Sequence, residues 1–163
     1  MSYYDYVDAH VFKPAKMFST GFLPESQSVP ERSNGYTLRD GRWVSNENTL
    51  PYRGTAAGGG YSTVDDLLRF AQALQAGKLL SPKLLSEATH PQISEKWYGY
   101  GFITVGDGPL RRYGHGGDSP GMNADIRIFP ESGYVLVSLS NIDPPAAYRV
   151  FRYYEPRMPI SGK

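Results

Sequence analysis

The chain has 163 residues, 40% of them hydrophobic and 20% charged, which is the composition of one globular domain with its own core. Seventeen Lys and Arg residues against 16 Asp and Glu give a net charge of +1, so no charge excess indicates nucleic acid or an anionic membrane as a partner. Cysteine is absent, which excludes disulfides, thiolate catalysis and zinc–thiolate sites.

The sequence also disfavours a membrane span and a metal site. No apolar stretch approaches the roughly 18 residues that cross a bilayer. The three histidines, His10, His90 and His115, share no metal-ligand spacing, so we expect no metal and no cofactor. Residues Met1–Asp5 have neither the basic nor the apolar segment of a signal peptide, and the compartment is therefore left open.

The first element in chain order is a helix. Aromatic and apolar residues at helical spacing predict it over Ser2–Phe12, with Ser2 as the N-cap. Pro14 should end this helix, because the residue before a proline disfavours helical backbone.

A turn-rich segment follows, from Phe18 to about Gly58, and long irregular segments of this kind are often functional. It contains a predicted hairpin with strands Tyr36–Leu38 and Arg42–Val44. The Asp-Gly pair within the turn Arg39–Arg42 supplies the positive φ angles that a two-residue hairpin turn requires.

The clearest helix is predicted near the middle of the chain. Ser62 is its expected N-cap, with Asp65 three residues later as in a capping box, and Gly77 ends it. Its apolar stripe comprises Val64, Leu67, Leu68, Ala71 and Leu74. A shorter helix should start at Ser81, with proline in its first turn, and run to about Thr89.

The hydrophobic period then changes from helical to alternating, which predicts strands. They are expected over Tyr98–Val105, Leu110–Tyr113, Asn123–Phe129 and Tyr134–Ser140, followed by a last helix over Pro145–Tyr154. Helices followed by consecutive strands predict an α+β fold, an antiparallel sheet flanked by helices, in a single domain spanning residues 1–163.

A glycine-rich segment, Tyr113–Gly121, lies between two of these strands. Four glycines in nine residues indicate a sharp turn or a close approach of the backbone to another group. His115 within this segment is a candidate catalytic or ligand-binding residue. The alternative is a strand connection that happens to contain a histidine.

The same segment matches the pattern Gly-x-Ser-x-Gly through Gly117–Gly121, but it lacks three features of the nucleophile elbow of α/β-hydrolases. Pro120 has no N–H to donate to an oxyanion hole. The residues that follow alternate as a strand rather than opening a helix. All three histidines precede Ser119, whereas the histidine of that triad follows its serine.

Several segments together resemble the class C β-lactamase-like family of serine hydrolases, which includes penicillin-binding proteins, esterases and D-amino-acid peptidases. His115-Gly116-Gly117 resembles the His-x-Gly variant of that family's third active-site motif. The other similar segments, in the family's order, are Val11–Thr20, Ala57–Leu67, Tyr98–Phe102, Ile128–Tyr134 and Leu139–Asn141. The resemblance covers nearly the whole chain and implies a partial β-lactamase/transpeptidase-like fold. Family members are often periplasmic or cytoplasmic in bacteria.

The family's first two motifs are absent from this sequence. No serine has a lysine three residues later, and no tyrosine has an asparagine two residues later, so both Ser-x-x-Lys and Tyr-x-Asn are missing. The resemblance places both motifs upstream of Met1. We therefore expect the chain to be the C-terminal portion of such a domain, without its nucleophile.

The resemblance also implies roles for individual residues. The implied catalytic residues are His115, Gly117 and Asp118, with the backbone N–H of Asp118 as half of the oxyanion hole. The implied substrate-binding residues are Gly116, Ser119 and Gly121.

Two hypotheses about function stay open. The first is part of an enzyme that transfers or hydrolyses the acyl group of an amide, ester or β-lactam in a small molecule or peptide, and that is inactive as this chain alone. The second is a non-catalytic module that binds a ligand or a protein through the same surface. Upstream coding sequence with both missing motifs would favour the enzyme.

The expected truncation predicts self-association as well. In the resembled family, strands from the N-terminal part pair beside the last strand, here Tyr134–Ser140. Without them this strand is an edge, and no charged residue lies between Tyr134 and Asn141 to block it. Edges of this kind pair with other chains, so we expect a homo-oligomer through this sheet edge.

Overall fold

The computed structural model describes residues 1–24 and 26–160. A four-stranded antiparallel sheet forms its centre, and the strands lie in chain order. They are β3 (Ile103–Val105), β4 (Arg112–Ser119), β5 (Met122–Phe129) and β6 (Tyr134–Ser140).

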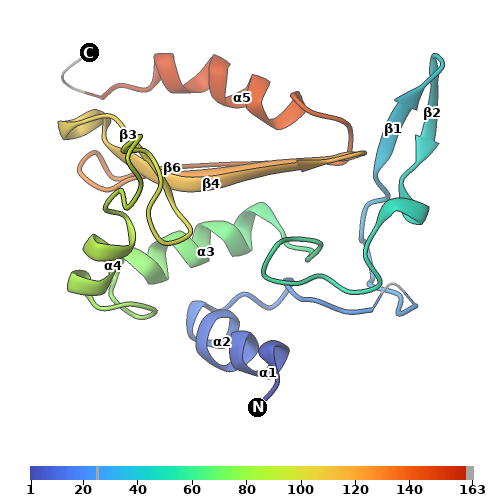
Figure 1. Cartoon of the computed structure of the whole chain (residues 1–163), viewed down its shortest axis with the longest axis horizontal. Coiled ribbons are helices and arrows are strands. Elements are labelled where there is room, and N and C mark those ends of the chain that lie inside the picture. Colours follow the sequence, from blue (N-terminus) through green and yellow to red (C-terminus); the bar gives the residue numbers. More distant parts are fainter. Residues whose placement is uncertain (25, 161–163) are drawn as a thin grey trace.

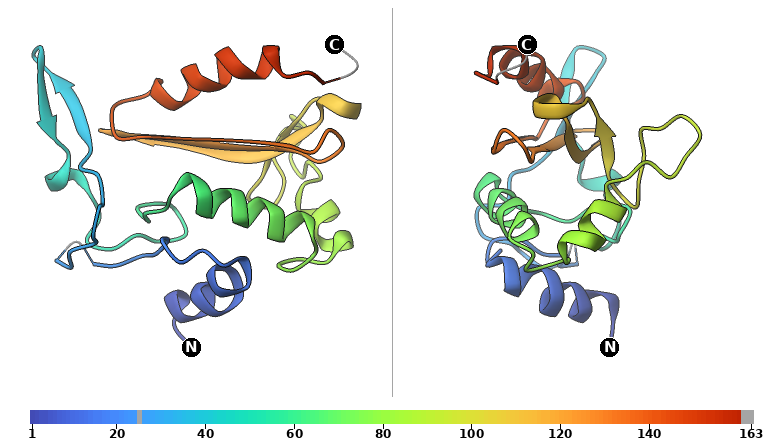
Figure 2. Two further views of the ribbon diagram at one scale, coloured as in Figure 1. Left: turned by 180° about the vertical axis from the view of Figure 1, so that it is seen from behind. Right: turned by 90° about the vertical axis from the view of Figure 1, so that its left-hand side faces the viewer.

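Helices cover both faces of this sheet (Figure 1). One face carries α5 (Ala146–Tyr154), and the other carries α3 (Val64–Gln75) and α4 (Pro82–Ala88). The N-terminal helices lie beyond α3, on the side away from the sheet (Figure 2). The predicted α+β fold, an antiparallel sheet flanked by helices, is confirmed.

The N-terminal helix continues past the proline that was expected to end it. It consists of α1 (Tyr3–Val7), a π-helical turn (Asp8–Phe12) and α2 (Lys13–Ala15). Ser2 caps α1 as predicted. The end predicted at Pro14 is wrong, because Pro14 lies in the first turn of α2, directly after the π-helical turn, where a backbone N–H has no partner within its own helix. The helix ends at Ala15, and the following residue, Lys16, has a positive φ of 59° that turns the chain away.

The predicted hairpin is present as β1 (Tyr36–Arg39) and β2 (Arg42–Ser45). Asp40 and Gly41 both have positive φ, 48° and 75°, as a type I′ turn requires. The hairpin stands at one end of the molecule, away from the helical layers (Figure 1).

The cap of α3 differs from the prediction by one residue. The hydroxyl of Thr63, rather than that of Ser62, accepts the N–H of Asp66 at 3.2 Å. The fully buried Asp66 carboxylate then accepts the N–H of Ser19 at 2.7 Å and the hydroxyl of Thr20 at 2.8 Å. This carboxylate fastens the start of the irregular segment to α3.

The other helix boundaries agree with the predictions. Gly77 follows α3 with a φ of 72°, and Ser81 caps α4. Only the second half of the predicted apolar stripe of α3 is buried against the sheet. There Ala71 and Leu74 belong to one core cluster, together with Tyr113 and Ile128 of the sheet.

Two strand predictions are wrong in their boundaries. The strand expected over Tyr98–Val105 is regular only in β3, because a bend at Gly101, with a φ of 79°, interrupts its first half. The strand expected to stop at Tyr113 instead continues as β4 through the glycines to Ser119. The glycine-rich segment is therefore mostly strand, and only Pro120-Gly121 forms the turn to β5.

At the other end of the sheet, β6 pairs with β5 along its length. Within the part of the chain that the structure describes, no strand pairs with the outer edge of β6. No helix among the described residues is long and apolar enough to cross a membrane.

The Asp143 carboxylate joins the β1–β2 hairpin to the end of the sheet. One oxygen accepts the N–H of Gly121 at 2.8 Å. The other accepts the N–H of Leu38 at 2.8 Å and the hydroxyl of Thr37 at 2.9 Å. These donors, the N–H of Gly121 foremost, hold the pKa of Asp143 below its ordinary value.

This anchor predicts a specific dependence of stability on pH. Because the folded-state pKa of Asp143 is lowered, its contribution is complete above the ordinary carboxyl pKa of about 3.9 and is lost as the pH falls through the folded-state value. The melting temperature of Asp143→Asn should therefore lie below that of the unmodified chain at neutral pH, and the difference should disappear in strong acid. Asp107→Asn, at a carboxylate that caps nothing, is the control. A difference that stays constant over the whole pH range would contradict this role.

Candidate active site

The third-motif segment lies on a strand with one open edge. At that edge β4 pairs with β3 over Arg112–Gly114 only. Between His115 and Ser119 no strand among the described residues pairs there, whereas the opposite edge pairs with β5 as far as Ser119. The backbone of this stretch is therefore accessible from one side.

The six residues with predicted roles divide between the two faces of the sheet and the turn. Side chains alternate along a strand, and Tyr113 packs in the core on the α3 face. His115, Gly117 and Ser119 share that face, whereas Gly116 and Asp118 lie on the α5 face. Gly121 belongs to the turn to β5.

His115 is exposed and makes two close contacts. Its Nε2 atom lies 3.0 Å from the hydroxyl oxygen of Tyr98. Its Nδ1 atom lies 2.6 Å from the carbonyl oxygen of Gly116. The two rings meet edge to face, with centroids 5.7 Å apart, so both the position and the orientation of the imidazole are defined.

The two glycines of the motif have different surroundings. A Cβ atom added to Gly117 would meet nothing within 4 Å, so this residue leaves open space beside His115. A Cβ atom added to Gly116 would lie 3.2 Å from the Tyr148 ring and 3.3 Å from the Asp125 carboxyl carbon. Glycine at that position allows α5 to pack closely on β4.

Acidic side chains surround Tyr148 on the α5 face. The Tyr148 hydroxyl lies 3.4 Å from a carboxylate oxygen of Asp118. Burial raises the pKa of Tyr148, and the negative charge of Asp118 raises it further. Burial also raises the pKa of Asp125, although the ion pair with Arg127, at 2.9 Å, opposes that effect.

The turn after Ser119 is held from outside the sheet. The N–H of Gly121 donates to Asp143, and the Asn46 side chain donates to the carbonyl of Pro120 at 3.0 Å. A Cβ atom at Gly121 would lie 2.8 Å from the backbone nitrogen of Tyr36. The turn leads into a strand, which agrees with the exclusion of a nucleophile elbow.

Asn123 was not identified as a site residue from the sequence. This buried amide accepts the N–H of Ala147 at 2.8 Å and donates to the carbonyl of Gly117 at 3.2 Å. It therefore fastens the first turn of α5 to the motif strand. Asparagine is depleted in strands, so an asparagine inside a predicted strand could have marked Asn123 as a residue with a specific role.

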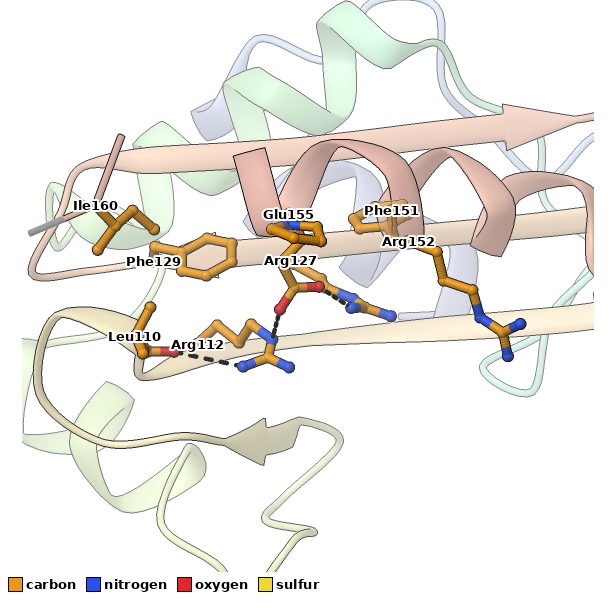
Figure 3. Close-up of a pocket in the computed structure, with 9 residues that line it drawn as sticks. Leu110, Arg112, Arg127, Phe129, Phe151, Arg152, Glu155 and Ile160 are labelled. Atoms are coloured by element: carbon orange, nitrogen blue, oxygen red, sulfur yellow. Dashed lines mark hydrogen bonds and ion pairs between the residues drawn. The ribbon is translucent and has the colours of Figure 1, made fainter. Parts of the chain in front are cut away.

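A pocket of about 400 Å³ lies elsewhere, between α5 and the sheet (Figure 3). Its apolar wall includes Phe129 and Phe151. Arg112 and Arg127 both pair with Glu155, the former at 2.7 Å. Since Glu155 already holds both arginines, their charges serve to fasten the end of α5 to β4 and β5, and the pocket is on the face opposite His115.

The described residues contain no group of three or more His, Cys, Asp or Glu side chains that could hold a metal ion.

Comparison with known proteins decides the family. The sequence model of the Beta-lactamase family matches residues 1–156. This chain belongs to the beta-lactamase family. The family expected from the sequence motifs is therefore confirmed, as is the partial β-lactamase/transpeptidase-like fold.

Relatives within this family include penicillin-binding proteins. PbpX, a penicillin-binding protein homologue of Bacillus subtilis (strain 168), is 34% identical over 143 residues, which cover 86% of this chain and 34% of PbpX. The crystal structure of a penicillin-binding protein from Bacillus halodurans matches 97% of this chain and 50% of that protein, with a TM-score of 0.89 and 26% identity. An octameric penicillin-binding protein homologue from Pyrococcus abyssi shares the fold, with a TM-score of 0.78 and 24% identity over 95% of this chain and 38% of that protein. The chain thus spans a third to a half of the length of these relatives.

The positions of Asn123 and His115 predict that alanine lowers stability clearly at the first residue and little at the second. Asn123→Ala removes a helix-capping acceptor and leaves the Gly117 carbonyl without its side-chain donor, which should lower the free energy of unfolding by about 1–3 kcal/mol. His115→Ala, at an exposed position, should change it by no more than about 0.5 kcal/mol. Denaturant unfolding measures both. An equal loss in the two variants would mean that His115 is a packing residue.

Proposed function

We propose that this chain supplies one wall of the acyl-transfer site of a serine hydrolase that acts on an amide, an ester or a β-lactam. This wall is the part of β4 from His115 to Ser119, which carries the third motif. The observation that carries the proposal is the open edge of β4 between His115 and Ser119, next to an exposed and oriented histidine. Membership of the beta-lactamase family and likeness to penicillin-binding proteins support this class of reaction.

The direction of the Asp118 backbone N–H supports its role in an oxyanion hole. Opposed residues of an antiparallel pair alternate between hydrogen-bonded and non-hydrogen-bonded, and a two-residue turn is closed by a hydrogen-bonded pair. Here Ser119 and Met122 close the turn, so the next pair, Asp118 and Asn123, is of the non-hydrogen-bonded type. The N–H of Asp118 then points away from β5, toward the open edge, where a developing oxyanion could accept it.

The remaining residues have complementary roles in this proposal. His115 and Gly117 form the surface that faces a bound acyl group, with Ser119 at its far end on the same face. Gly116 and Gly121 act through the backbone, the first by admitting α5 and the second by forming the anchored turn. The side chain of Asp118 lies on the other face, so its contribution is through the main chain.

The chain alone should not turn over substrate, because the sequence has no Ser-x-x-Lys pair to supply an activated nucleophile. We expect no hydrolysis of nitrocefin or of p-nitrophenyl esters above the buffer rate. Steady turnover that persists through purification, together with a serine labelled covalently by a fluorophosphonate, would contradict this expectation.

A chimera tests the role of the wall itself. This chain would replace the matching segment of PbpX, and covalent labelling by a fluorescent penicillin would be followed over time, with PbpX as the positive control. Asp118→Pro removes the backbone N–H and should slow labelling about 10²–10³-fold, whereas Asp118→Ala keeps it and should label like the parent chimera. Equal rates for the two variants would refute the oxyanion role. A folded chimera that binds penicillin without being labelled would favour the alternative, a non-catalytic binding module.

We further propose that the chain self-associates through the outer edge of β6. This edge has no strand partner among the described residues, and no charge lies between Tyr134 and Asn141 to prevent pairing. Leu139 on this strand is 38% exposed. The octameric assembly of the Pyrococcus abyssi homologue supports an oligomer in general terms, without indicating which surface is used.

A charge placed on β6 tests this association. Leu139→Lys should shift the chain from dimer or higher oligomer to monomer in light scattering at high micromolar concentration, because a lysine disfavours pairing at a strand edge. Val150→Lys, an equally exposed apolar position on α5, is the matched control and should leave the oligomer unchanged. A clean monomer for the unmodified chain would refute the proposal.

A further inference from the structure

The contact between Tyr98 and His115 has a definite hydrogen-bond direction. A carbonyl oxygen can only accept, so the 2.6 Å contact with the Gly116 carbonyl requires a hydrogen on Nδ1 of His115. In the neutral ring the lone pair is then on Nε2. The Tyr98 hydroxyl, 3.0 Å away, must donate to it.

We propose that Tyr98 is a positioning residue, which together with the Gly116 carbonyl fixes His115 as the Nδ1–H tautomer and forms one hydrogen-bonding unit with it. Both imidazole nitrogens are then engaged within the protein. The atom that the unit leaves available is the phenol oxygen of Tyr98, which retains acceptor capacity after donating its proton.

The backbone holds Tyr98 in this place. Its strand-like bridge to Ile103 and the bond from the N–H of Gly99 to the carbonyl of Phe102, at 2.8 Å, close the bend. On the other side, the N–H of Tyr100 donates to the carbonyl of Ala88 at 2.8 Å, which ties the bend to the end of α4. The tyrosine ring is thus placed over the motif by two independent elements.

This arrangement determines which ligand chemistry the wall fits. When His115 is in this tautomer, the pair has a free acceptor atom and no free donor. It can then hydrogen-bond to a donor such as an amide N–H, and it has no donor left for a carboxylate. The preferred acyl group therefore presents an N–H or O–H donor, rather than a carboxylate, to the third motif. This specificity rests on the proposed function, whereas the tautomer does not.

Nitrogen-15 NMR of the histidine-labelled chain tests the tautomer directly. At a pH where the ring is neutral, His115 should show a pyrrole-type Nδ1 and a pyridine-type Nε2, with His10 and His90 as references in the same spectrum. Tyr98→Phe removes the donor, so the Nε2 resonance should shift and the Nδ1–H population should fall. Tyr100→Phe, at a tyrosine 62% exposed on the same bend, should change neither. An Nε2–H tautomer in the unmodified chain, or nitrogen resonances unaffected by Tyr98→Phe, would overturn the proposal whatever the chain's activity.

The specificity is tested in the PbpX chimera with two p-nitrophenyl esters, one whose acyl chain ends in a carboxamide and one whose chain ends in a carboxylate. We expect acylation to favour the carboxamide by up to about tenfold, the effect of one hydrogen bond, and Tyr98→Phe to remove this preference. Tyr100→Phe should retain it. An equal or reversed preference in the parent chimera would overturn the assigned ligand class. A chimera that no ester acylates would refute the proposed function and leave the NMR result standing.

Discussion

The Asn123 amide connects the three parts on which the candidate site depends. It lies inside the sheet on β5, accepts from the first turn of α5, and donates to the carbonyl of Gly117 on β4. Because it is buried, both bonds replace water, and leaving either group unpaired would be costly. This one side chain therefore links the start of the helix on one face to the strand whose open edge carries the motif, in addition to the backbone pairing of β4 with β5.

The two faces of β4 serve separate purposes. On the α5 face, Gly116 leaves room for the Tyr148 ring, and Glu155 pairs with two arginines from neighbouring strands. Packing and ion pairs on this face therefore hold α5 against the sheet. On the α3 face, Tyr113 is buried in the core, and the next residue on that face, His115, is exposed. The period of two along a strand allows one stretch of chain to contribute to the core and to a site without conflict.

Local patterns in the sequence predicted the helices, the hairpin and the approximate positions of the strands, because each depends on neighbouring residues. Asp40-Gly41 is an example, since positive φ at both positions leaves few alternatives to the turn observed. The continuation of β4 through its glycines was missed because pairing with β5, a long-range interaction, overrides low strand propensity. The His115 contact with Tyr98 was likewise beyond a sequence argument, as it depends on how a bend 17 residues away is folded back. The motif residues themselves were found from the sequence, whereas the side chains that position them were not.

The Asp143 carboxylate also has a mechanical consequence. It accepts hydrogen bonds from the backbone N–H of Leu38 in the β1–β2 hairpin and from that of Gly121 in the turn between β4 and β5. The hairpin, which stands away from the helical layers, is attached to the end of the sheet at its base, by Asp143 together with the bond from Asn46 to the Pro120 carbonyl (Figure 1). A force that pulls on the hairpin should therefore act first on the turn after β4, and through that turn on the strand that carries His115.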